Sequence, residues 1–129
     1  MMQEGHDAKI VLVVEDDGLS RKLTADILEL QGYRVVPCGD GPSALAYLHE
    51  NAPPQLVLLD IGLPDMNGYE VFRRLRGDER LKPVKIVALS ASTMKEDEIK
   101  VRAAGFDDFI PKPLDIPKFI QTVKRYLGA

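Results

Sequence analysis

Hydrophobic residues along this chain follow two different spacings. Five short apolar runs, at residues 10–14, 34–37, 56–59, 84–89 and 108–110, have the length and continuity of buried strands. The segments between them place apolar residues three and four positions apart, which is the period of a helix packed on one side. Strands that alternate with helices predict an α/β fold, in which helices cover both faces of a parallel, doubly wound sheet.

The helix between the first two strands has the most regular pattern. Leu19, Leu23, Ile27 and Leu30 recur at spacings of four and three, which predicts one apolar face that packs on the sheet. Gly32 follows this stretch. Because glycine readily adopts the backbone conformation that closes a helix, we expect the helix to stop there.

The next two helices have clear start and stop signals. One begins after residues 40–41, with a proline in its first turn, and ends before Pro53. The other is expected to be capped by Asn67, with Glu70 reaching back as the partner of a capping box. It stops at Gly77.

The last two helices differ in the apolar surface that they offer. Residues 95–104 carry only Ile99, Val101 and two alanines among many charges, so this helix is a candidate moving part. Residues 116–127 carry a full apolar stripe, and Asp115 precedes them as an expected cap.

Composition limits the class of protein. A chain of 129 residues that is 45% apolar can form one compact domain, which we expect to span residues 9–129 after a flexible tail of residues 1–8. The formal net charge of −3 argues against a nucleic-acid partner and against an anionic membrane, since both attract basic surfaces. A lone cysteine, Cys38, excludes an internal disulfide and fits a reducing compartment. With no signal peptide or membrane-spanning stretch, a cytoplasmic location is expected.

Chemically useful side chains follow the strands. Glu15 and Asp16 come after the first strand, Asp60 after the third, Ser90 after the fourth and Lys112 shortly after the fifth. In open α/β sheets the carboxyl ends of the strands form one edge, where ligands bind. Carboxylates gathered there repel one another unless a cation joins them, and oxygen ligands suit Mg²⁺. A divalent ion and Lys112 would balance the three acids.

These residues, in this order and spacing, resemble the signatures of response-regulator receiver domains over essentially the whole chain. The resemblance rests on Glu15-Asp16, on Asp60 with the segment 61–68, on Ser90-Ala91 and on Lys112-Pro113. It implies a flavodoxin-like, doubly wound (βα)5 fold with strand order 2-1-3-4-5. Within the family, the chain looks most like stand-alone regulators of the chemotaxis and cell-division (DivK-like) kinds, the latter because of residues 92–98.

The resemblance implies a site for phosphoryl transfer. Asp60 would accept the group from a phosphohistidine on a sensor histidine kinase or a histidine phosphotransfer protein. Asp16 and Asp60 would bind Mg²⁺ directly, as would the backbone carbonyl of Gly62, while Glu15 would act through water. Lys112 would pair with the phosphoryl oxygens. The first acid of this site is Glu15 where aspartate is commoner, which alters its reach to the metal.

A hydroxyl and a switch complete the implied mechanism. Ser90 would hydrogen-bond the phosphoryl group, and the ring of Phe109 would then fill the vacated space. This would remodel the face made by the helix 95–104, the fifth strand and the helix 116–127, to which a downstream protein binds. Phe109 has no hydroxyl with which to contact that partner. Small side chains at Gly62 and Ser92 would leave a water path to the phosphoryl group open and so tune its lifetime.

Elementary chemistry agrees with these roles. An aspartate is ionised at neutral pH and needs no general base to act as a nucleophile. Phosphoryl transfer depends mainly on positioning and charge stabilisation, which a metal ion and a lysine supply. Such a domain assists its own phosphorylation and dephosphorylation without being an enzyme that turns over substrate.

Four alternatives fit parts of the pattern. A phosphatase of the haloacid-dehalogenase type needs an Asp-x-Asp nucleophile motif after its first strand, whereas this chain has Glu15-Asp16-Asp17-Gly18. A flavin carrier needs a phosphate loop there, and the acids would repel it. A receiver module of a hybrid kinase and an unphosphorylated interaction scaffold share the receiver fold itself.

Overall fold

The structure, a computed structural model, describes residues 8–62, 67–91 and 95–128. Five strands alternate with helices, and each strand pairs in parallel with its neighbours in the order β2-β1-β3-β4-β5. The flavodoxin-like topology expected from the sequence is therefore confirmed. The elements are β1 (Ile10–Val14), α2 (Gly18–Leu30), β2 (Arg34–Cys38), α3 (Gly41–Glu50), β3 (Leu56–Asp60), α4 (Gly68–Arg76), the 3₁₀ helix η1 (Glu79–Leu81), β4 (Lys85–Ser90), α5 (Lys95–Ala104), β5 (Asp108–Pro111) and α6 (Ile116–Leu127).

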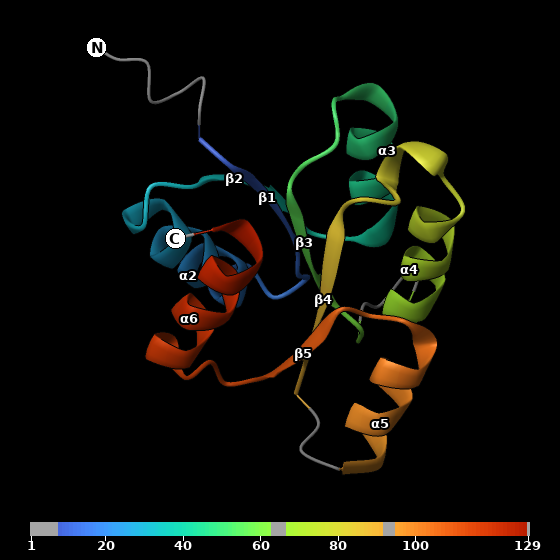
Figure 1. Ribbon diagram of the computed structural model, residues 1–129. Helices are drawn as coiled ribbons and strands as arrows, with labels where there is room; N and C mark the ends of the chain where they lie inside the picture. The colour runs from blue at the N-terminus through green and yellow to red at the C-terminus, as the bar shows by residue number, and fades with distance from the viewer. Residues whose placement is uncertain (1–7, 63–66, 92–94, 129) are drawn as a thin grey trace.

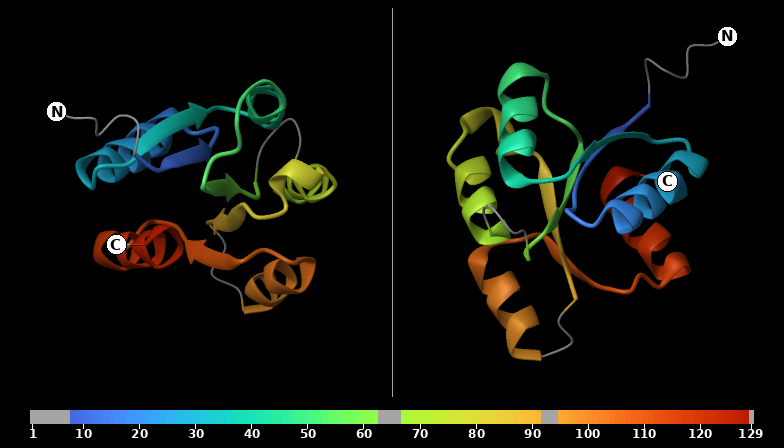
Figure 2. Two further views of the ribbon diagram at one scale, coloured as in Figure 1. Left: turned by 45° about the horizontal axis from the view of Figure 1, so that its top comes forward. Right: turned by 180° about the vertical axis from the view of Figure 1, so that it is seen from behind.

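The helices form two layers around the sheet. Figure 1 shows α2 and α6 on one face, while α3, α4 and α5 cover the other. Both views in Figure 2 keep the same division. Because all five strands are parallel, their carboxyl ends lie at one edge of the sheet.

The central strands are buried because they meet a helix layer on each side. Successive residues of a strand point to opposite faces, so Val11 and Val13 pack with α2 and α6, whereas Leu12 and Val14 pack with α3 and α4. All four residues are 0% exposed. The continuous apolar runs of the sequence are explained by this burial on both faces.

The first helix forms as expected, but its buried face is different. Asp17 caps α2 by accepting from the Leu19 amide. Of the four residues in the predicted stripe, only Ile27 is buried, while Leu19 and Leu30 are 79% and 84% exposed. Because each residue of a helix advances by about 100°, Thr24 and Leu28 lie beside this stripe, and they are the ones that face the sheet. The prediction of a core-facing leucine stripe was wrong.

Other differences from the sequence predictions are local. The Asn67 side chain caps α4 by accepting from the Glu70 amide at 3.0 Å. The carboxylate of Glu70 pairs with Arg73 and Arg74 instead of completing a capping box, because two arginines one turn on offer charged donors. Several strands run one residue further than expected, since the parallel ladder continues to the Ser90 and Pro111 pair. The helix η1 was not predicted.

Gly68, the first residue of α4, packs against the end of β3. A Cβ atom at this position would lie 2.4 Å from the Ile61 Cα and 2.8 Å from the Asp60 carbonyl oxygen. Both contacts involve backbone, which cannot rotate away as a side chain can. The absence of a side chain at Gly68 therefore lets α4 approach the strand that carries Asp60.

We predict that Gly68→Ala lowers the free energy of unfolding by about 1–3 kcal/mol, the usual cost of overpacking. Gly77→Ala is the matched control, because its Cβ would meet only carbonyl oxygens at 3.6 Å. Chemical denaturation of the two variants checks this. Equal stability of Gly68→Ala and the unmodified protein would contradict the close packing of α4 on β3.

Candidate functional site

Three carboxylates meet at the carboxyl edge of the sheet. Glu15 follows β1 directly and Asp60 is the last residue of β3, and the two are 1% and 6% exposed. Asp16 is exposed. One oxygen from each of the three side chains lies within 4.8 Å of the others. The strand-end placement expected from the sequence thus gathers Glu15, Asp16 and Asp60 into one cluster.

Lys112 joins the two buried carboxylates. Its Nζ donates to Glu15 Oε1 at 2.7 Å and to Asp60 Oδ2 at 3.1 Å. The backbone of Lys112 is fixed as well, because its amide donates to the Ser90 carbonyl at 2.7 Å. The Lys112-Pro113 peptide bond is cis. The end of β4 therefore holds the lysine in place beside the ends of β1 and β3.

The electrostatics of this cluster are unbalanced. Burial raises the pKa of Glu15, and the nearby Asp60 carboxylate raises it further, although the hydrogen bond from Lys112 opposes both effects. For Lys112, burial acts to lower the pKa, but the hydrogen bonds and charges of Glu15 and Asp60 outweigh it and raise the pKa. The cluster thus has one ammonium group, bound to Glu15 and Asp60, for its three carboxylates.

The remaining carboxylate oxygens differ in their partners. Asp60 Oδ1 accepts from the Gly62 amide at 2.8 Å, and Glu15 Oε2 accepts from the Asp17 amide at 3.2 Å. The side chain of Asp16 makes no hydrogen bond within the described part of the chain. Its position is therefore set by the backbone of the β1–α2 loop, and its oxygens can serve a ligand from solvent.

The donor set fits a hard divalent cation. Mg²⁺ prefers carboxylate, carbonyl and water oxygens, and it usually keeps several waters beside one or two carboxylates. The cluster offers three carboxylates, of which one is exposed, and a single compensating ammonium group. Mg²⁺ would supply the charge that the cluster lacks.

Ser90 and Phe109 lie on adjacent strands next to this edge. Ser90 ends β4, is 5% exposed and is paired in register with Pro111. Phe109 is paired with Ala88, two positions before Ser90. Because side chains alternate along a strand, Ser90 and Phe109 project from the same face of the sheet. Phe109 is partly buried there against the core beneath α3, α4 and α5.

Two parts of the expected site lie outside the described residues. These are Ser92, which was expected to tune the lifetime of the phosphoryl group, and residues 63–66 after Gly62. Gly62 itself is described, and it is exposed beside Asp60. The role of its carbonyl as a metal ligand stays a prediction.

Sequence reasoning missed two features of the site. Arg21 of α2 donates from Nη1 to the Glu15 carbonyl at 2.8 Å and to the Asp16 carbonyl at 3.4 Å. A basic residue one helical turn after the acids is the signal that could have pointed to it. The second feature is a hollow of about 460 Å³ beside Lys112, lined by Asp17, Ser20, Leu23, Thr24, Ala91, Lys112, Pro113 and Leu114.

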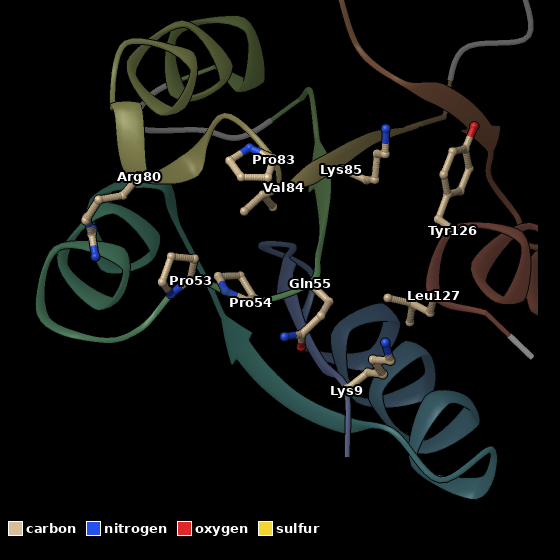
Figure 3. Close-up of a pocket in the computed structure, with 10 residues that line it drawn as sticks. All are labelled: Lys9, Pro53, Pro54, Gln55, Arg80, Pro83, Val84, Lys85, Tyr126 and Leu127. Carbon is tan, nitrogen blue, oxygen red and sulfur yellow. The ribbon is translucent and has the colours of Figure 1, made fainter. Parts of the chain in front are cut away.

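A second hollow lies at the opposite, amino edge of the sheet. Figure 3 shows this pocket of about 350 Å³, where Lys9, Gln55 and Lys85 stand at the beginnings of β1, β3 and β4. Its walls include three prolines and the Tyr126 ring, and none of its lining residues is a carboxylate. It lacks the ligands that the acidic cluster brings together, so the candidate site is the carboxyl edge.

Among residues 8–62, 67–91 and 95–128, no helix combines the length and apolar character needed to cross a lipid bilayer.

Comparison with known proteins agrees with this geometry. A family model described as the response regulator receiver domain matches residues 11–124. The polar-differentiation response regulator DivK of Brucella ovis is 41% identical over 120 residues, which cover 93% of this chain and 97% of the relative.

Solved structures show the same fold. The receiver domain of a sensor histidine kinase from Pseudomonas aeruginosa, crystallised with a magnesium ion coordinated in its active site cleft, has a TM-score of 0.85 and 28% identity, covering 95% of this chain and 99% of that one. The chemotaxis response regulator CheY4 of Vibrio cholerae has a TM-score of 0.85 and 26% identity, covering 92% and 98%. The chain therefore belongs to the family of response regulator receiver domains and is DivK-like.

Proposed function

We propose that this receiver domain accepts a phosphoryl group on Asp60 from a phosphohistidine of a sensor histidine kinase or a histidine phosphotransfer protein. The observation that carries the proposal is the shared ammonium group of Lys112, bound to Asp60 at 3.1 Å and to Glu15 at 2.7 Å. Lys112 and a Mg²⁺ ion held by the neighbouring carboxylates would together offset the negative charge that a phosphoryl group adds at Asp60.

The transfer itself exchanges one bond at phosphorus for another. A carboxylate oxygen of Asp60 attacks the phosphorus atom, and the bond from phosphorus to the donor imidazole breaks, leaving its electron pair on the nitrogen. Bound Mg²⁺ would neutralise charge on the phosphoryl oxygens and bring the two reactants together. Asp16, Asp60 and the Gly62 carbonyl would hold the ion, with Glu15 acting through water.

Lys112 and Ser90 would receive the new phosphoryl oxygens. Lys112 needs only to turn its ammonium group from the Asp60 carboxylate to the added group, because its backbone is tied to β4. Ser90 ends the same strand and would donate its hydroxyl. Water that attacks phosphorus from the side opposite to the Asp60 oxygen would later release phosphate and regenerate Asp60. The signal would therefore be temporary.

The exposed leucines of α2 suit the donor protein. Leu19 and Leu23 are 79% and 49% exposed, and Leu23 lines the hollow that also contains Lys112. An apolar surface beside the phosphoacceptor would let a partner helix bring its phosphohistidine to Asp60. We propose this surface as the docking site of the phosphodonor.

The output surface would be the face formed by α5, β5 and α6. Asp108, 9% exposed, accepts from Arg102 of α5 at 3.3 Å and from Arg125 and the Tyr126 hydroxyl of α6 at 3.3 and 3.0 Å. Since only Val101 of α5 is buried, this carboxylate is a main attachment of α5. Asp108 immediately precedes Phe109 in β5. A shift of the Phe109 ring would therefore move Asp108 and the two helices that it binds, and a downstream protein would meet a changed surface.

We predict that the unmodified protein gains one phosphoryl group when it is incubated with acetyl phosphate and Mg²⁺, and that Asp60→Asn gains none. Asp26→Asn, in which an exposed aspartate of α2 is changed, is the matched control and should be modified normally. Intact-protein mass spectrometry measures the modification. The proposal would be refuted if Asp60→Asn were phosphorylated to the same extent as the protein without substitutions. It would also be refuted if the protein without substitutions gained no phosphoryl group in the presence of Mg²⁺.

We further predict that a larger side chain at Gly62 slows loss of the phosphoryl group. A Cβ at this position would lie 3.5 Å from Asp60 Oδ1, which is an ordinary contact, so Gly62→Ala and Gly62→Asn are expected to fold. Their side chains would stand in the path of the attacking water and lengthen the lifetime severalfold. Phosphate release after removal of the donor measures this, with Gly77→Ala as the control. Unchanged lifetimes in both Gly62 variants would show that water reaches the group by another route.

A further inference from the structure

We propose that Arg21 is a positioning residue for the metal site and that Gly39 leaves the space in which its guanidinium group lies. This inference rests on the proposed function, because it concerns the Mg²⁺ site of that function. No ligating role is assigned to Arg21, which acts through the backbone that carries Glu15 and Asp16.

The three acids of the cluster are held in different ways. The carboxylates of Glu15 and Asp60 are fixed by Lys112 and by the backbone amides of Asp17 and Gly62. The Asp16 carboxylate has no such partner among residues 8–62, 67–91 and 95–128. The direction of the Asp16 Cα–Cβ bond therefore depends on the two peptide groups on either side of it.

Arg21 binds both of those peptide groups. Its Nη1 donates to the carbonyl of Glu15 at 2.8 Å and to the carbonyl of Asp16 at 3.4 Å. The Arg21 backbone is anchored in turn, because its amide donates to the Asp17 carbonyl at 2.8 Å in the first turn of α2. The helix thus fixes the loop that follows β1. Rotating either peptide group to turn the Asp16 side chain away would break one of these bonds.

Two glycines flank the guanidinium group. A Cβ at Gly39 would lie 3.3 Å from Arg21 Nη1, and a Cβ at Gly18 would lie 3.6 Å from Nη2. The end of β2 is tied to the same loop, since the Glu15 amide donates to the Cys38 carbonyl at 3.0 Å. The guanidinium therefore lies between the start of α2 and the loop after β2, and a methyl group at Gly39 would push it aside by a few tenths of an ångström.

The sign of the effect separates positioning from simple electrostatics. Arg21 is a cation near a cation site, so removal of its charge alone would tighten Mg²⁺ binding. If Arg21 orients Asp16, its removal weakens Mg²⁺ binding instead, because the exposed ligand is no longer held toward the ion. Partners that orient metal ligands typically contribute about tenfold or more to metal affinity.

The test is an NMR titration with Mg²⁺ that follows the backbone amides of Asp16 and Gly62 in the full chain. Arg21→Gln is expected to weaken Mg²⁺ binding by about tenfold. Lys22→Gln is the matched control, because it removes the same charge from the neighbouring residue, whose ammonium group pairs with Asp26. It should leave the affinity within about twofold, since the charge of an exposed lysine is screened by salt.

Two more variants keep the test decisive if Arg21→Gln is unstable. Arg21→Lys keeps the charge but has a shorter side chain, which does not extend as far as Arg21 Nη1, so it should also weaken binding. Gly39→Ala should weaken binding less, and it should have no further effect when combined with Arg21→Gln, because both changes act on one contact. Thermal unfolding without Mg²⁺ identifies any general loss of stability.

A kinetic measurement separates positioning from a structural defect. In phosphorylation by acetyl phosphate, Arg21→Gln should raise the Mg²⁺ concentration at half-maximal rate and leave the rate at saturating Mg²⁺ unchanged. If Arg21→Gln binds Mg²⁺ as tightly as the protein without substitutions, or more tightly, this inference is overturned. The proposed function would still stand. If the unmodified protein itself binds no Mg²⁺, the proposed function fails.

Discussion

The rest of the site depends on the ammonium group of Lys112, which is shared by two buried carboxylates. Glu15 and Asp60 would repel each other at the ends of adjacent strands if Lys112 did not donate to both. Breaking a buried charge pair costs about 3–5 kcal/mol, because the remaining charge is left without a partner. With one ammonium group for three acids, the folded protein keeps an excess of negative charge at this site.

The fold meets the geometric demands of this arrangement. Parallel strands bring the residues after β1, β3, β4 and β5 to a single edge, although they are far apart in the chain. Three local contacts then fix the geometry of the site. Gly68 lets α4 approach β3, Arg21 holds the loop after β1, and the Lys112 amide is tied to Ser90. Asp108 and Phe109 begin β5, which is separated from β3 only by β4, so the attachments of α5 and α6 belong to the same sheet as Asp60.

Much of the fold could be predicted from the sequence because its signals are strong and local. Continuous apolar runs identified buried strands, and the expected caps at Asn67 and Asp115 formed as side-chain acceptors at helix starts. The acids and Lys112 were predictable because parallel topology fixes where strand ends lie. The exposed leucines of α2 were misjudged, since a helical period shows that residues share a face and does not show which face meets the sheet. Arg21 and Asp108 were missed because their roles come from hydrogen bonds that only the folded chain brings together.

The most direct test of the account is the structure of the protein with beryllofluoride and Mg²⁺, because beryllofluoride mimics a phosphoryl group on a carboxylate. We predict beryllofluoride on an oxygen of Asp60, Mg²⁺ bound by Asp16 and Asp60, and the Lys112 ammonium group in contact with fluoride. We also predict the Ser90 hydroxyl turned toward the added group. Beryllofluoride on another residue, or Mg²⁺ bound away from Asp16 and Asp60, would contradict the central claim that this carboxylate cluster is the phosphoacceptor site.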